Sequence, residues 1–346
     1  MNGFALMVSL WVDGLGMGQV PHALLGPCQV ARANAQMKGR LLYFDRKLLT
    51  DHRLWSPALR ERRRLLVYLP PGYDPGRKYP LALFLHGAAQ DEKFFLQALA
   101  IPFDRAICAG LMPPVIIAAP DGSIRGRSGL LDVASFWADT KAGQFEQYLM
   151  GDVWDFLHRE FPLREGRESK AIIGVSMGGS AAMRLGIAHK DRVKCVLAVM
   201  PLLNLRYADC RGEYRTPFDP ACTSFQDRYK GWDALGRRRI FVLRNKDLYT
   251  PLFGKGQEVV DGMSRLSPIE QVMRGELAPG ELDLYVGWGA KDEFNVAAQC
   301  ESFLHEARRR GIEVAAEVDP KGRHDVATGL RLLPGMARWA SGRVAK

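Results

Sequence analysis

Ser176 lies in the sequence Gly174-Val175-Ser176-Met177-Gly178, between an apolar run and a segment of helical composition. A G-x-S-x-G sequence between a strand and a helix is typical of a nucleophile elbow, a sharp turn that raises the serine hydroxyl above a sheet. Side chains two positions before and after the serine would collide with neighbouring backbone, which the two glycines avoid. The segment therefore predicts that Ser176 is a catalytic nucleophile.

A serine nucleophile needs a general base, and that base needs a carboxylate to orient it. In an α/β-hydrolase the serine is followed along the chain by the acid and then by the histidine, both on loops after strands. Of the seven histidines, only His324 follows a terminal strand-like run in a glycine-containing loop. His324 is therefore the predicted base. His189 and His305 fall within helical patterns, and His86 is expected to support a glycine turn.

The acid has two candidates, because Asp292 and Glu293 are adjacent after the strand-like run 282–286. We favour Asp292, since a shorter side chain loses less rotamer freedom when it is held in place. Glu293 stays the alternative, and either carboxylate could instead cap the helix that follows.

The tetrahedral intermediate of acyl transfer needs two N–H donors for its oxyanion. The backbone N–H of Met177, directly after the nucleophile, is the first predicted donor. The second is expected from the loop after the apolar strand 81–85, and Ala88 is our choice. Backbone donors constrain the position of these residues more than their type.

The elements that must hold these residues alternate along the chain. Apolar runs predict strands over 41–44, 64–69, 81–85, 115–119, 171–175, 196–200, 282–286 and 313–318. Helical patterns occupy 94–109, 145–161, 177–190, 296–310 and 326–339. This alternation predicts an α/β fold with a mostly parallel central sheet and helices on both faces.

The sequence predicts one α/β domain over residues 39–346, preceded by a leader or loose arm over 1–38. Residues 202–281 break the alternation and carry one internal strand-like run, 240–243, so they are read as a cap or an insertion before the acid-bearing strand. Together with the loop that contains Phe136 and Trp137, this region is expected to line the site's entrance and set substrate choice.

The charge and hydropathy of the sequence indicate which classes of binding partner to expect. The 346 residues carry 48 Lys and Arg against 38 Asp and Glu, a net charge of +10. The basic residues are scattered in short runs without a nucleic-acid motif, so solvated faces are predicted rather than nucleic-acid binding. The sequence contains no run of 18 or more apolar residues, so it predicts no membrane span. The oligomeric state is left open.

Six cysteines are too few for a disulfide framework in a chain of this length. Cys108, Cys195 and Cys300 fall in apolar patterns and are expected to be buried thiols. Cys210 and Cys222 flank a loop-like segment and are the one pair that could bridge in an oxidising compartment. No C-x-x-C or H-E-x-x-H spacing predicts a metal site.

The amino-terminal segment does not decide the compartment. Residues 4–12 are apolar and Ala31-Arg32-Ala33 resembles a cleavage site, but Asp13 interrupts the apolar run and the first basic residue is Arg32. This is atypical of a secretory signal, so cytoplasmic and secreted locations both stay open.

Several further motifs carry a resemblance. The chain has L-P-P-G-Y-D at 69–74, Tyr79-Pro80 before L-x-L-F-L-H-G, and G-V-S-M-G-G at the elbow. In these stretches it resembles the putative-esterase family of α/β-hydrolases, which includes S-formylglutathione hydrolases, feruloyl esterases, enterochelin esterases and mycolyltransferases. Gly289-Ala290-Lys291-Asp292 is similar to the family's G-x-x-D acid loop, and Gly322-Arg323-His324 to its G-x-H loop.

The resemblance covers roughly residues 40–202 and 282–340 and implies ester hydrolysis without a cofactor. The sequence thus predicts a serine carboxylesterase that hydrolyses a small-molecule or acyl ester through an acyl-enzyme, with Ser176, His324 and Asp292 as its triad. The alternatives are an acyltransferase of the same fold, an amide or polyester hydrolase, and a catalytically decayed binding module. Residues that can serve as nucleophile, base, acid and oxyanion donors occupy all the expected positions, which argues against a catalytically decayed module.

Overall fold

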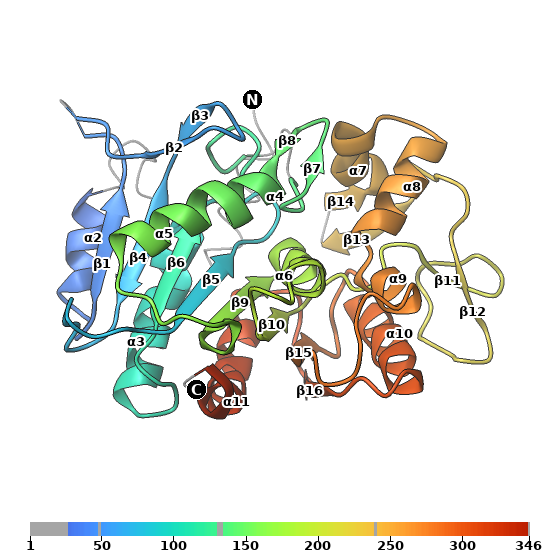
Figure 1. Ribbon diagram of the computed structural model, residues 1–346. Helices are drawn as coiled ribbons and strands as arrows, with labels where there is room; N and C mark the ends of the chain where they lie inside the picture. The colour runs from blue at the N-terminus through green and yellow to red at the C-terminus, as the bar shows by residue number, and fades with distance from the viewer. Residues whose placement is uncertain (1–26, 48–49, 130–133, 239–240, 345–346) are drawn as a thin grey trace.

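The structure is a computed structural model, and it describes residues 27–47, 50–129, 134–238 and 241–344. Its centre is an eight-stranded sheet in the order β1-β4-β6-β5-β9-β10-β15-β16 (Figure 1). Strand β4 pairs antiparallel with both β1 and β6, and every other neighbouring pair is parallel. The strands are β1 (Arg40–Phe44), β4 (Leu65–Leu69), β5 (Leu81–Leu85), β6 (Ile116–Pro120), β9 (Lys170–Val175), β10 (Cys195–Val199), β15 (Asp283–Gly289) and β16 (Val314–Asp319).

Each of the eight predicted strands is found in this sheet within a few residues of its expected bounds. Strands β4, β5, β6 and β10 are buried along their whole length. Strands covered on both faces read as continuous apolar runs, which is why the sequence predicted them well. The predicted α/β class with a mostly parallel central sheet is confirmed.

Helices cover both faces of the sheet, and each face has its own hydrophobic core. One core includes side chains of α4 (Phe145–Gln147), the π-helical η4 (Tyr148–Val153), α5 (Trp154–Glu160), α6 (Met177–Ala188) and α10 (Val296–Arg309). The other includes side chains of α2 (Pro27–Asn34), the π-helical η3 (Phe95–Leu99), α3 (Ala100–Cys108) and α11 (Val326–Val344). The predicted helices correspond to these elements.

Part of the predicted amino-terminal arm is described, and it is not loose. Residues 27–34 form α2, whose Ala33 is buried against the second core. The N–H groups of Lys38 and Gly39 donate to the carboxylate of Asp104 on α3 at 3.1 and 2.7 Å. Residues 1–26, with the apolar run 4–12, lie outside the described residues, whereas the cleavage-like Ala31-Arg32-Ala33 is part of α2.

Residues 202–281 contain more structure than the one predicted strand. They form two hairpins, β11 (Tyr207–Asp209) with β12 (Thr223–Phe225) and β13 (Ala234–Arg238) with β14 (Phe241–Arg244), outside the central sheet. Three short helices follow, α7 (Asn245–Phe253), α8 (Gln257–Leu266) and α9 (Pro268–Met273). Their apolar side chains belong to the same core as α6 and α10, so this region packs as part of the body.

One expectation about side-chain exposure was wrong. Cys108, the last residue of α3, is exposed, whereas Cys195 and Cys300 are buried as predicted. Phe136 and Trp137, in the loop expected to line the entrance, are themselves buried, with 2% and 0% exposure. The Trp137 ring fills the space beside Gly122, where a side chain would collide with it, and its Nε1 donates to the carbonyl of His86 at 3.3 Å.

Cys210 and Cys222 form a disulfide at the end of the β11–β12 hairpin. Among the residues that the structure describes, no helix is both long and apolar enough to cross a bilayer.

Candidate active site

Ser176 occupies the turn between β9 and α6 and has φ 54° and ψ −121°, a conformation that is costly for a residue with a side chain. Its N–H donates to the carbonyl of Val199 on the neighbouring strand at 2.9 Å, which ties the turn to the sheet. A Cβ on Gly174 would run into the carbonyl of Gly178, and one on Gly178 into the carbonyl of Leu85. The two glycines are therefore required by close backbone contacts, as the sequence indicated.

The structure brings Ser176, His324 and Asp292 into one chain of hydrogen bonds. His324 Nε2 lies 2.8 Å from Ser176 Oγ, and His324 Nδ1 lies 2.6 Å from Asp292 Oδ2. With a proton on Nδ1, the imidazole donates to the carboxylate and Nε2 accepts from the serine hydroxyl. His324 is 3% exposed and the Asp292 side chain 0%, so this contact is shielded from water.

The three residues come from the carboxyl ends of different strands. Ser176 follows β9, Asp292 follows β15, and His324 follows β16, the neighbour of β15. Gly289, the last residue of β15, packs directly on Gly322, where a side chain would collide. This contact brings the two loops together, so that Asp292 and His324 meet across the edge of the sheet.

Glu293, the alternative acid, contacts the same histidine differently. Its Oε2 accepts from the backbone N–H of His324 at 3.1 Å, and its Oε1 pairs with Arg323 at 3.0 Å. The imidazole contact thus belongs to Asp292, whereas Glu293 holds the backbone of the histidine loop. Sequence reasoning did not foresee this second contact.

The loop after β5 lies against the serine turn. A Cβ on Gly87 would stand 3.3 Å from Ser176 Cβ, and the Gly87 N–H donates to Gln90 Oε1 at 2.9 Å. Ala88, the next residue, is partly buried against the first core. Met177 is the first residue of α6, and the first N–H groups of a helix have no carbonyl partner within it. The two predicted oxyanion donors thus belong to the residue directly after Ser176 and to the loop whose Gly87 packs against the serine turn.

His86 supports this loop. Its Nε2 accepts from the Gly122 N–H at 3.0 Å, and its Nδ1 donates to the Gly87 carbonyl at 2.9 Å. Burial lowers the pKa of His86, which favours the neutral ring that these two contacts need. His189 and His305, the other two histidines not predicted to be the base, have other partners. His189 contacts Glu146 at 2.8 Å, and His305 packs on Phe218.

The sequence analysis missed two aromatic residues near the triad. The Phe294 ring packs edge-on against His324 with 4.8 Å between ring centres. Tyr214, far away in the sequence, donates to the carbonyl of Phe294 at 2.6 Å. Phe294 could be suspected from its closeness to Asp292 in the chain, but nothing local marks Tyr214.

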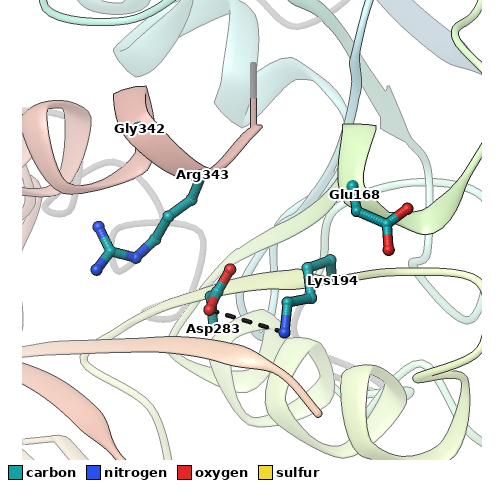
Figure 2. Close-up of a pocket in the computed structure, with 5 residues that line it drawn as sticks. All are labelled: Glu168, Lys194, Asp283, Gly342 and Arg343. Carbon is teal, nitrogen blue, oxygen red and sulfur yellow. Dashed lines mark ion pairs between the residues drawn. The ribbon is translucent and has the colours of Figure 1, made fainter. Parts of the chain in front are cut away.

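The structure also has a pocket of about 380 Å³. It is lined by Glu168, Lys194, Asp283, Gly342 and Arg343, which Figure 2 shows as sticks. Lys194 and Asp283, an ion pair at 3.9 Å, stand at the amino ends of β10 and β15, whereas the triad stands at the carboxyl ends. This pocket is therefore separate from the candidate active site.

Within the described part of the chain, no group of three or more His, Cys, Asp or Glu side chains is placed to hold a metal ion.

Residues 56–307 match the model of the Esterase family, described as putative esterase. The chain belongs to this family. The match includes Ser176 and Asp292 but ends before His324.

Solved structures resemble the whole fold. A ferulic acid esterase superposes with a TM-score of 0.63 at 17% identity, over 88% of this chain and 99% of the other. An S-formylglutathione hydrolase from Agrobacterium tumefaciens gives a TM-score of 0.64 at 15% identity, over 89% and 97% of the two chains. The serine hydrolase FphF from Staphylococcus aureus gives 0.58 at 15% identity, over 87% and 98%. These structures share the α/β-hydrolase fold of the chain, and its membership of the Esterase family makes it an ester hydrolase.

Proposed function

We propose that this enzyme is a serine carboxylesterase that works through an acyl-enzyme formed on Ser176. The observation that supports this most is the bridging position of His324, with 2.8 Å to the serine hydroxyl and 2.6 Å to the Asp292 carboxylate. A serine hydroxyl is a weak nucleophile until a base takes its proton, and this imidazole lies within reach to do so.

In the proposed reaction, Ser176 Oγ attacks the ester carbonyl carbon while its proton moves to His324 Nε2. The carbonyl oxygen becomes an oxyanion and accepts from the N–H groups of Met177 and Ala88. The imidazolium then donates the proton to the departing alkoxide, which leaves as an alcohol. Asp292 stays ionised throughout and stabilises the imidazolium.

Water completes the cycle. Its proton passes to His324 Nε2 as its oxygen attacks the acyl carbon, and the second tetrahedral intermediate uses the same two N–H donors. Collapse of that intermediate returns the proton to Ser176 Oγ and releases the carboxylic acid. This sequence needs no group from outside the chain except water.

The proposal is tested by hydrolysis rates for p-nitrophenyl esters of increasing acyl length, measured on the parent and on Ser176→Ala. We expect release of p-nitrophenol with a preferred chain length, and loss of release in Ser176→Ala by a factor on the order of 10⁴ or more. Equal rates in the two proteins would contradict the proposal. Ester formation when an alcohol is added would identify acyl transfer instead.

A further inference from the structure

The segment 211–221 is a loop whose two ends are fixed together. It connects β11 to β12, and Asp209 pairs with Thr223 as the last pair of that ladder. The Cys210–Cys222 disulfide follows directly on this pair. Asp209, the last residue of β11, is buried, and its Oδ1 accepts from the N–H groups of Arg211 and Glu213 in the loop at 2.8 and 2.9 Å. We call residues 211–221 the disulfide-closed loop.

Tyr214 extends from this loop to the segment that carries the proposed acid. Its hydroxyl donates to the carbonyl of Phe294 at 2.6 Å and accepts from Gln299 Nε2 on α10 at 3.0 Å. Burial raises the pKa of Tyr214, and the nearby Asp292 charge adds to this. The phenol therefore stays protonated and remains a donor at neutral pH.

Phe294 links this phenol to the triad. Its N–H donates to Asp292 Oδ1 at 2.8 Å, while the other oxygen of that carboxylate contacts His324. Its ring packs on the imidazole of His324. Fixing the Phe294 backbone therefore fixes both the carboxylate and one face of the base.

The disulfide-closed loop also contacts the residues on either side of Phe294. Asn295, which has φ 54°, donates from Nδ2 to the carbonyl of Tyr214 at 2.5 Å. Arg215 donates to the carbonyl of Glu293 at 3.3 Å. Three consecutive residues after Asp292 are thus held by one loop, and a left-handed Asn is kept in place by a contact to that loop.

We propose that Tyr214 is a positioning residue for Asp292, and that the disulfide-closed loop is the support that holds it there. The inference rests on the proposed function of Asp292 as the acid of the triad. Tyr214 does not touch the reacting atoms. It contacts the backbone of Phe294, which in turn contacts Asp292, so its loss should change the geometry of the triad more than the binding of the ester.

The test compares Tyr214→Phe with Tyr207→Phe. Tyr207 is a matched control, because its hydroxyl donates to Pro217 of the same loop at 2.8 Å but does not reach the acid segment. For p-nitrophenyl acetate we expect Tyr214→Phe to lower kcat about tenfold, since small misplacements of reacting groups are costly, with KM within about twofold. Tyr207→Phe should keep kcat within about twofold. An equal loss in both variants, or a loss in neither, would overturn the proposal.

A second readout does not depend on turnover. The proton on His324 Nδ1, held by Asp292, should give a far-downfield proton NMR resonance in the parent. Tyr214→Phe should move this resonance upfield and speed its exchange with water, and Tyr207→Phe should leave it in place. An unchanged resonance in Tyr214→Phe would overturn the positioning role. If the parent hydrolysed no ester, the proposed function would fall while this measurement still decided the role of Tyr214.

If Tyr214→Phe does not fold, the same measurements are made on the parent after reduction of the Cys210–Cys222 disulfide. We expect reduction to lower kcat and shift the same resonance, and reoxidation to restore both. No change on reduction would contradict the supporting role of the loop.

Discussion

At the scale of single residues, the two adjacent carboxylates Asp292 and Glu293 hold different parts of one histidine. Asp292 contacts the imidazole, and Glu293 accepts from the backbone N–H of His324 while pairing with Arg323. Adjacent side chains diverge, so only one of them reaches the ring. The division of contacts predicts unequal effects when each carboxylate is neutralised.

Asp292→Asn should lower kcat by at least about 10²-fold, because an amide no longer stabilises the imidazolium and can favour the wrong tautomer. Glu293→Gln should change kcat by less than about threefold, since its remaining carbonyl oxygen still accepts from the His324 N–H. Steady-state hydrolysis of p-nitrophenyl acetate by both variants measures this. A crippled Glu293→Gln beside a mild Asp292→Asn would reverse the assignment.

At the scale of elements, the turn from β9 to α6 depends on the space that glycine leaves. A side chain at Gly178 would enter the carbonyl of Leu85 on β5, the strand that leads to Ala88. The serine turn and the predicted oxyanion loop are therefore packed against each other and cannot move independently.

Gly178→Ala should lower the free energy of unfolding by about 1–3 kcal/mol, as overpacking in a tight contact does. Gly151→Ala is the matched control: Gly151 lies in η4, and a Cβ there meets nothing within 4 Å. That change should leave stability equal or raise it by up to about 1 kcal/mol. Urea unfolding measures both, and equal effects of the two substitutions would contradict this account of the elbow.

The loop between β5 and η3 also contains a buried carboxyl. Burial, with smaller contributions from the negative charges of Asp91 and Asp121, raises the pKa of Glu92 to about 8. Tyr43 donates to its Oε1 at 2.7 Å. In the unfolded chain Glu92 would release its proton near pH 4.5, so the folded state holds the proton to higher pH.

The stability linked to Glu92 is therefore complete below about pH 4.5 and is lost as the pH rises towards 8. Glu92→Gln removes this dependence because the amide does not titrate. Between pH 5 and 9 the parent should lose on the order of 1–5 kcal/mol of unfolding free energy relative to the variant. Urea unfolding at several pH values tests this, and parallel pH curves for the two proteins would disprove it.

At the scale of the whole molecule, one sheet carries the candidate site at the carboxyl ends of its strands, and residues 202–281 pack beside that end. The β13–β14 hairpin rests on Phe294, since a Cβ on Gly236 would collide with that ring. Phe136, beside Met177, stacks on Tyr249 of α7 with 5.5 Å between ring centres. Both contacts connect this region to residues next to the triad.

Replacing residues 234–244 with a two-glycine turn should alter the relative rates for p-nitrophenyl esters of different acyl length. The excision is feasible because the N–H of Asn245 already donates to the carbonyl of Asp233 at 3.1 Å, so the cut ends are adjacent. Circular dichroism checks the fold. A folded variant with the parent's profile would show that the hairpin has no part in substrate choice.

The sheet could be predicted from the sequence because β4, β5, β6 and β10 are buried on both faces and read as apolar runs. The elbow and the loops of Asp292 and His324 follow from their order along these strands. Helices α7, α8 and α9 were not predicted, since they are short and interrupted by proline and charge. Tyr214 contacts Phe294 across 80 residues of chain, and no local pattern reports such a contact.

The central claim is that Ser176 forms the covalent intermediate. Intact-protein mass spectrometry after reaction with a fluorophosphonate probe tests it most directly. We expect one adduct on the parent, located on the peptide that contains Ser176, and none on Ser176→Ala. Equal labelling of the two proteins, or an adduct on another residue of the parent, would contradict it.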